Sequence, residues 1–442
     1  MNGMLSQSGR AVALLGARLP GLALMAQPLL PLIVLISVLG GPLPFPLWVS
    51  WAIALAPLPV RLWRTGRLFE ATPFDIPIPL FLVGMGIGLA VSVDRPLGSV
   101  AMQTYIACML FFYGLTSNAN LGPRYWWSVG AAITLGVLGF SVMTFSQGNN
   151  FYGSGGSKVV PINRWLIDLL EPLPEFGGWL GNIPLHNNTL GLALGIGLPA
   201  LVAIVIFGKG HFRIAAGVLG SLFSAILFLS LSGVGWVAAL VGLVFIGCCA
   251  LRKRAYALLP VLPVLGGLAY LAWNNVDWLN HMFPWSAVTS RVRIWETGLT
   301  MIIMDHPWFG VGPGQYVLSG PPQSPHNAYL LLYADAGLLG ILALIGAAGV
   351  TLGLGRQVMR FTRVRAPSRT NPWHAVGVGT LAALAAGAAV SMLESSTAKT
   401  WIDTGGNARY VAMPGVWFWA AMLVVAHRHL YPSRSSEKEL RR

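Results

Sequence analysis

The sequence contains few charged residues, and this shortage indicates the class of protein. Only 10% of its 442 residues are Asp, Glu, Lys or Arg, whereas a soluble domain has about 25%. Hydrophobic residues make up 55% of the chain, and the mean hydropathy is +0.66. A soluble globular protein is therefore excluded, and an integral membrane protein is expected.

Cysteine and acidic residues are also scarce. The three cysteines, Cys108, Cys248 and Cys249, lie in or beside apolar runs and show neither a disulfide framework nor a metal-binding spacing. Asp and Glu number 14 against 28 Lys and Arg, which gives a net charge of +14. No module of aromatic and basic residues accompanies this excess, so nucleic acid is not an expected partner. Basic residues beside apolar runs instead indicate membrane topology and contacts with lipid headgroups.

Long apolar runs dominate the rest of the chain. A helix needs about 20 apolar residues to cross a hydrocarbon layer of about 30 Å. We predict twelve such spans: 20–41, 43–60, 76–93, 98–116, 126–146, 187–207, 214–232, 234–251, 255–273, 326–354, 374–393 and 410–427. The predicted fold class is thus an all-α polytopic integral membrane protein with about 12 transmembrane helices. Residues 1–442 show no internal repeat or soluble linker, so we expect a single membrane domain.

The distribution of basic residues predicts the orientation. With the N-terminus in the cytoplasm, 21 of the 28 Lys and Arg fall on the cytoplasmic side of the twelve spans. This bias follows the positive-inside rule, and the opposite orientation would invert it. Both termini are therefore expected in the cytoplasm. The two long loops, 147–186 and 274–325, are expected on the opposite face.

The first long loop offers few chemical signals. Its Gly and Ser content predicts a surface segment, and the plainest interpretation is a loop without chemistry. Lys158 and Arg164 remain candidate contacts for an anionic substrate.

The second long loop contains a predicted helix with two arginines. Apolar residues recur at helical spacing after Ser290, and Thr289 or Ser290 is a suitable cap. Arg291 and Arg293 would then occupy the first turn, where the helix dipole disfavours cations. Backbone N–H groups and guanidinium forks together bind phosphate well. The alternative is that both arginines are interfacial residues that contact lipid phosphates.

A second helix is predicted to begin near residue 324. Ser324 can be its cap and Pro325 its first residue, which places His326 in the first turn. A neutral imidazole at the positive helix end is suited to act as a general base, although it could equally be an interfacial histidine. Asp335 lies deeper in apolar sequence, either as a functional acid or as a bridge between helices.

The residues between these two helices are interpreted as structural. The segment DHPWFGVGPGQY, 305–316, is rich in turn residues but fits no phosphate-binding fingerprint. His306 is predicted to be a packed loop histidine rather than a catalyst.

An ordered set of short motifs runs through this region. Besides HNNTLGLALGIGLPA at 186–200, the set contains Arg291, Trp295, His306-Pro307, Gly310-Val311-Gly312, His326-Asn327 and Gly337-Leu338-Leu339-Gly340. Together with twelve spans, it resembles the O-antigen ligase/polymerase family of bacterial inner-membrane proteins.

The resemblance implies a glycosyltransferase that needs neither metal nor cofactor and works on the periplasmic face. The donor would be a glycan on undecaprenyl pyrophosphate, and a single displacement would invert the anomeric configuration. A ligase passes the glycan to a lipid A–core hydroxyl, whereas a polymerase of O-antigen or exopolysaccharide passes it to another lipid-linked repeat unit.

The resemblance also implies roles for particular residues. Arg291 would hold the donor pyrophosphate, and His326 would activate or orient the acceptor hydroxyl. The candidate substrate-binding residues are Arg293, Asn327, Tyr329, Lys158 and Arg164. Membrane lipids are further expected partners.

One position departs from the family pattern. A family arginine at the outer end of a middle helix aligns with Gly233 in LSLSGVGWVAAL, 229–240. The candidate cations to replace it are Arg293, Lys158, Arg164, Lys399 and Arg409. Two rival functions remain, a transporter of lipid-linked glycan and a scaffold subunit. The first is less favoured because helix centres hold almost no charge.

Overall fold

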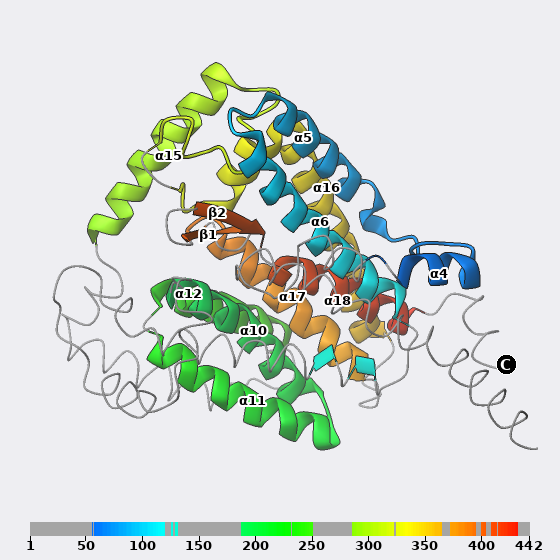
Figure 1. Ribbon diagram of the computed structural model, residues 1–442. Helices are drawn as coiled ribbons and strands as arrows, with labels where there is room; N and C mark the ends of the chain where they lie inside the picture. The colour runs from blue at the N-terminus through cyan, green and yellow to red at the C-terminus, as the bar shows by residue number, and fades with distance from the viewer. Residues whose placement is uncertain are drawn as a thin grey trace, which may run out of the picture.

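The computed structural model describes a largely helical protein (Figure 1). The described residues are 55, 57–119, 125–126, 129–130, 187–230, 232–250, 285–321, 324–364, 372–394, 399–403, 408–412 and 414–431. In chain order, the elements are α4 (Pro57–Thr65), a 3-10 turn (Pro73–Asp75), α5 (Pro77–Val91), α6 (Arg95–Ser117), α10 (Asn187–Phe207), α11 (Gly210–Leu229), α12 (Gly233–Ala250), α15 (Trp285–Asp305), α16 (Ala328–Val364), α17 (Pro372–Val390), β1 (Lys399–Asp403), β2 (Ala408–Ala412) and α18 (Pro414–Leu430).

Six of the predicted spans agree with these helices, whereas the predicted spans 234–251 and 410–427 fall on α12 and α18, which are not among the helices long and apolar enough to cross a membrane. Among the described residues, six helices are long and apolar enough to cross a membrane: Pro73–Val91, Arg95–Ser117, Leu190–Phe207, Gly210–Phe228, Ala328–Phe361 and Pro372–Val390. The all-α class is confirmed, apart from an antiparallel hairpin of β1 and β2 that was not predicted. The predicted spans at 20–41 and 255–273, most of 43–60 and of 126–146, and the loop 147–186 lie outside the described residues. The count of twelve, the single domain and the orientation remain predictions.

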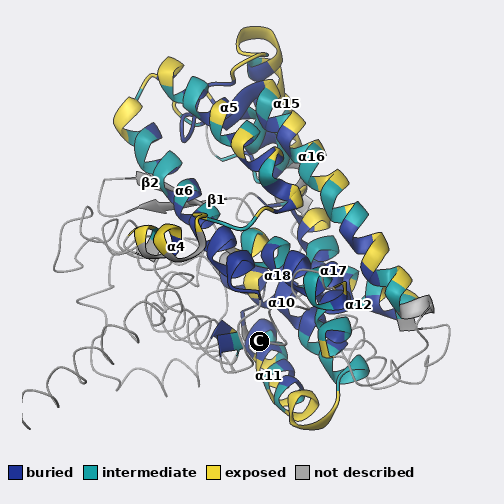
Figure 2. Ribbon diagram, turned by 90° about the vertical axis from the view of Figure 1, so that its right-hand side faces the viewer, coloured by how far each residue is buried: buried dark blue, intermediate teal, exposed yellow. Residues whose placement is uncertain are grey.

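Two groups of helices pack together through small residues. Helix α10 packs against α11, α12 and α17, while α16 packs against α5, and α18 joins α6 to α17 (Figures 1 and 2). A side chain on Gly195 would overlap the backbone of Gly235, so α10 and α12 are in backbone contact. Because lipid tails are as apolar as leucine, such close packing is a main source of helix association in membranes.

Helix α16 is interrupted at Gly337, which has φ 60° and ψ −151°. The break leaves the Ala334 carbonyl free to accept hydrogen bonds from the N–H groups of Val311, at 2.8 Å, and Gly312, at 3.1 Å. On the other side of the break, the Leu338 N–H donates to the Trp308 carbonyl at 3.0 Å. The loop after α15 is therefore held by the backbone of α16.

Replacing Gly337 with alanine should destabilise this junction. The backbone conformation is available almost only to glycine, and the added Cβ would overlap the Trp308 carbonyl. We expect a loss of about 3 kcal/mol and an apparent melting temperature several degrees lower in detergent. Gly349→Ala is the matched control on the same helix, because no atom lies within 4 Å of its added Cβ. Equal melting temperatures for the two variants would contradict the inference that position 337 requires glycine.

A partly buried ionic cluster lies at the opposite end of the bundle from α15. The Arg428 guanidinium on α18 contacts the Glu70 carboxylate at 2.8 Å and the carbonyls of Ala71, at 2.7 Å, and Thr116, at 2.5 Å. Arg61 on α4 contacts the same carboxylate at 3.6 Å. The cluster thus joins α18 to α6 and to the segment after α4.

Candidate functional site

Helix α15 presents one face to the rest of the protein. Ile294 is 4% exposed, Gly298 is buried, and Arg291 and Trp295 are half-buried, whereas Arg293 is exposed. Residues three or four apart share a helix face, so Arg291 lies with Trp295 on the packed face. The predicted caps Thr289 and Ser290 are wrong, because α15 is already helical at Trp285. The two arginines are therefore not in the first turn.

Two aromatic residues attach α15 to the rest of the site. The Trp295 indole donates from Nε1 to the Pro325 carbonyl at 2.5 Å, and the Tyr316 hydroxyl donates to the Ile294 carbonyl at 3.2 Å. Gly298 makes room for that hydroxyl, since an added Cβ would overlap it. Burial raises the pKa of Tyr316 to about 12, so the phenol keeps its proton at neutral pH. The position of α15 relative to residue 325 is thus determined.

The start of α16 differs from the prediction. The helix begins at Ala328, and the Asn327 side chain caps it by accepting from the Leu330 N–H at 3.1 Å. Ser324 is therefore not the cap, and His326 precedes the helix. His326 has φ 46°, a left-handed conformation that is uncommon outside glycine. Asn327, expected to contact substrate, has a capping role in this structure.

His326 faces a carboxylate from a distant part of the chain. Its Nδ1 atom lies 3.4 Å from Oε1 of Glu394, which follows α17. The His326 side chain is 32% exposed and that of Glu394 only 5%, so the imidazole is accessible while the acid is covered. A carboxylate at Nδ1 favours the tautomer that leaves Nε2 free to accept a proton.

Backbone and phenol contacts hold the ends of α16 and α17 together. The Ala328 N–H donates to the Ser391 carbonyl at 2.7 Å, and the Tyr329 hydroxyl donates to the Ala388 carbonyl at 2.6 Å. Tyr329, predicted to bind substrate, thus fixes the two helix ends. These contacts place Glu394 beside His326.

Trp295 connects the helix turn that bears Arg291 with the segment that bears His326. Arg291 lies one helical turn before Trp295, and the indole of Trp295 contacts the residue next to His326. Within the described residues, Arg291 forms no ion pair, so its guanidinium is available to an anion. Arg293 lies on the exposed face and points away from this junction.

The structure gives less information about the other candidate cations. Lys158 and Arg164 lie outside the described residues. Lys399 belongs to β1. Arg409 belongs to β2, where it pairs with Ile402 of β1. Gly233 is the first residue of α12.

The loop between α15 and α16 is structural, as predicted. The Asp335 carboxylate is fully buried and accepts from the Gly314 N–H at 3.1 Å, so it stabilises the loop. Gln315 exchanges two hydrogen bonds with the backbone of Asp94, at 2.9 and 3.0 Å. His306 is exposed, so its predicted packing is wrong.

This arrangement combines an accessible cation with an imidazole–carboxylate pair. A guanidinium stabilises phosphate oxygens, and an imidazole with a free Nε2 accepts a proton from a hydroxyl. Among the described residues, no group of three His, Cys, Asp or Glu side chains is placed to hold a metal ion. A guanidinium and an imidazole–carboxylate pair are groups suited to the displacement of a phosphorylated leaving group by a hydroxyl.

Comparison with known families agrees with this geometry. The family model Wzy_C, described as O-antigen ligase, matches residues 218–345. The matched range holds α12, α15, the loop after it and the start of α16, and it includes Arg291 and His326. The match supports the resemblance inferred from the motifs, whereas Glu394 lies beyond it. No curated protein matches the sequence.

Proposed function

We propose that this chain, whose central region matches the O-antigen ligase family, is a membrane glycosyltransferase that transfers a glycan from undecaprenyl pyrophosphate to a lipid A–core hydroxyl. The observation that carries the proposal is the His326–Glu394 pair beside the helix face that bears Arg291. The family match alone supports the wider class of O-antigen ligases and polymerases.

The two halves of the site have complementary roles. The acceptor hydroxyl attacks the anomeric carbon, and the bond between that carbon and the pyrophosphate oxygen breaks. Negative charge grows on the departing pyrophosphate, where the Arg291 guanidinium stabilises it. The hydroxyl proton passes to Nε2 of His326, and Glu394 stabilises the resulting imidazolium.

Two further features of the reaction follow from these roles. A single displacement by the hydroxyl inverts the anomeric configuration. A fixed guanidinium supplies the charge that a magnesium ion supplies in many phosphate-handling enzymes, so the reaction proceeds without metal.

The proposal places the reaction on the periplasmic face of the bacterial inner membrane. The positive-inside distribution supports this orientation, because α15 and residue 326 follow an odd number of predicted spans from a cytoplasmic N-terminus. The donor and the acceptor are both lipids and reach the site by diffusion within the membrane.

The main alternative is a polymerase, in which another lipid-linked repeat unit supplies the hydroxyl. The described geometry suits both acceptors. A transporter is less well supported, since the described ionisable groups gather at helix ends rather than near helix midpoints.

Reconstitution in liposomes tests the proposal. The purified chain is supplied with lipid-linked glycan and either lipid A–core or a second lipid-linked repeat unit, with and without EDTA. We expect a glycosylated lipid A–core whose new linkage has the inverted configuration by NMR, in equal yield with EDTA. Elongated lipid-linked glycan would instead establish the polymerase. Transport of the glycan without any new glycosidic bond would refute the transferase proposal.

A further inference from the structure

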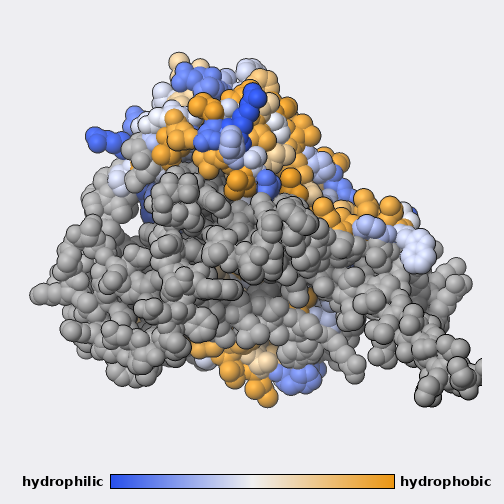
Figure 3. Space-filling model, viewed as in Figure 1, coloured by the Kyte–Doolittle hydropathy of each residue, from blue (hydrophilic) through white to orange (hydrophobic). Residues whose placement is uncertain are grey.

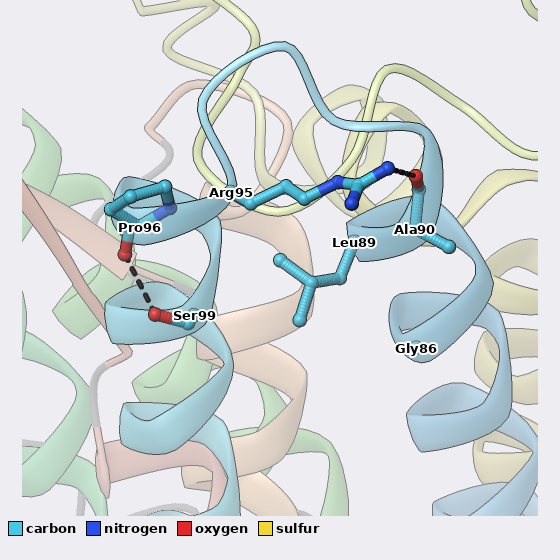
Figure 4. A pocket seen from close by; sticks show the side chains of 6 residues that line it. All are labelled: Gly86, Leu89, Ala90, Arg95, Pro96 and Ser99. Carbon is cyan, nitrogen blue, oxygen red and sulfur yellow. Dashed lines mark hydrogen bonds between the residues drawn. The ribbon is translucent and has the colours of Figure 1, made fainter.

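A groove lies between α5 and α6 (Figure 4). Its helices end on the side of the bundle that also carries α15 (Figure 1). Its volume is about 480 Å³, within the range of small-molecule sites. Helix α5 contributes Gly86, Leu89 and Ala90, and α6 contributes Arg95, Pro96 and Ser99. None of these residues belongs to the site around His326.

The α5 wall of the groove is apolar and open. No atom lies within 4 Å of a Cβ added to Gly86, so this position faces free space. Val83, which is 54% exposed, and the exposed Ala90 lie on the same helix face as Gly86. Figure 3 shows apolar and hydrophilic residues side by side over this upper end of the molecule. An exposed apolar helix face in a membrane protein is the surface that contacts lipid chains.

The cation of the groove is Arg95, whose side chain reaches from α6 to the end of α5 (Figure 4). Its Nη2 atom donates to the Ala90 carbonyl at 3.0 Å, and within the described residues Arg95 forms no ion pair. A guanidinium has five N–H donors, so most of them remain for another acceptor. The neighbouring Asp94 carboxylate caps α6 through the Leu97 N–H at 2.9 Å.

The depth of Arg95 matches that of lipid phosphates. Helices α5 and α6 are both long and apolar enough to cross a membrane, and Arg95 is the first residue of α6. The end of a spanning helix lies at the level of the headgroups. In the predicted orientation this turn is periplasmic, where the positive-inside rule disfavours arginine. A lipid phosphate is a suitable partner for an arginine in this position.

We propose that this groove binds a lipid that carries a phosphate, with the phosphate on Arg95 and a hydrocarbon chain along Gly86 and Ala90. The ligand is either a membrane phospholipid or a polyprenyl phosphate, since both have this chemistry. The Gln315–Asp94 hydrogen bonds connect the groove to the loop that docks on α16. The lipid phosphate on Arg95 is therefore one residue along the chain from Asp94, which is hydrogen-bonded to the segment joining α15 to α16. The proposal is independent of the roles assigned to Arg291 and His326.

Native mass spectrometry of the purified full-length protein tests the groove. The protein is titrated with phosphatidylglycerol, undecaprenyl phosphate and undecaprenol, which lacks the phosphate. Two variants remove different parts of the site: Arg95→Gln removes the charge, and Gly86→Leu fills the apolar wall. Gly349→Leu is the control for the second, because its added Cβ also meets no atom within 4 Å. Melting temperatures verify that all variants fold.

We expect at least one phosphate-bearing lipid to bind the wild type about tenfold more tightly than undecaprenol, and Arg95→Gln to remove that difference. Gly86→Leu should weaken the same lipid about tenfold, while Gly349→Leu leaves its affinity unchanged. The tighter of the two phosphate lipids identifies the source. Equal affinity for undecaprenol, or unchanged binding in Arg95→Gln and Gly86→Leu, would overturn the proposal.

Discussion

We expect glycan transfer to fall about 100-fold to 1,000-fold when Arg291 is replaced by alanine, and to change about threefold or less in Arg293→Ala. The two arginines lie two residues apart on α15 but on different faces. Arg291 shares the packed face with Trp295, whose indole contacts the residue before His326. If a guanidinium stabilises the departing pyrophosphate, only the one on this face can reach it.

The Arg291→Ala and Arg293→Ala variants serve as controls for each other. Both variants lose one positive charge from the same helix, so effects of net charge and of lipid attraction are matched. The measurement is the initial rate of transfer in liposomes at equal protein levels. Equal losses in the two variants would indicate general interfacial electrostatics instead of a specific pyrophosphate contact.

Replacement of His326 by alanine should reduce transfer about 1,000-fold, and replacement of Glu394 by glutamine about 10-fold to 100-fold. The carboxylate orients the imidazole and stabilises its protonated form, so its loss is smaller than loss of the base. If Glu394 acts through His326, the double variant should be no slower than His326→Ala. Independent losses that multiply would show that Glu394 has a separate role.

A chemical rescue separates a base from a structural histidine. Free imidazole should restore part of the transfer activity of His326→Ala and none of that of Arg291→Ala. His306→Ala is the control, since His306 is exposed in the neighbouring loop, and its rate should stay within about twofold of the wild type. Full activity of His326→Ala without imidazole would contradict the proposal that His326 is the general base.

The spanning helices could be predicted from the sequence because hydropathy and length act locally. The helix limits of α5, α10 and α17 differ from the predicted spans by at most a few residues. The break at Gly337 could not be predicted from the sequence, since glycine is common in membrane helices. Its conformation depends on Trp308 and Ala334, whose backbone groups meet there only in the folded chain.

The caps were mispredicted because several residue types compete for that role. Pro284 directly precedes α15, and this signal favours an earlier start than Thr289. Before α16, Ser324 and Asn327 are both good caps. Asn327 takes the role because Trp295 binds the Pro325 carbonyl and His326 is left-handed. That competition is decided by tertiary contacts.

The partner of His326 could not be assigned from local pattern. Glu394 is 68 residues away and follows a different helix. The available signal was an acid at the end of an apolar run, which is a functional candidate in a membrane protein. Its recognition required knowledge that α16 and α17 meet at their ends. The separation of Arg291 from Arg293 likewise required the true helix start and the packed face of α15.

The cluster of Arg428, Glu70 and Arg61 has a consequence for biogenesis. Arg428 lies 358 residues after Glu70. This contact can therefore form only after the chain between the two residues has been synthesised. Until α18 enters the membrane, the acid and the carbonyls of Ala71 and Thr116 lack that guanidinium. A chain that ends before residue 428 therefore leaves these acceptors without that partner, and we expect it to be less stable than a chain that contains α18.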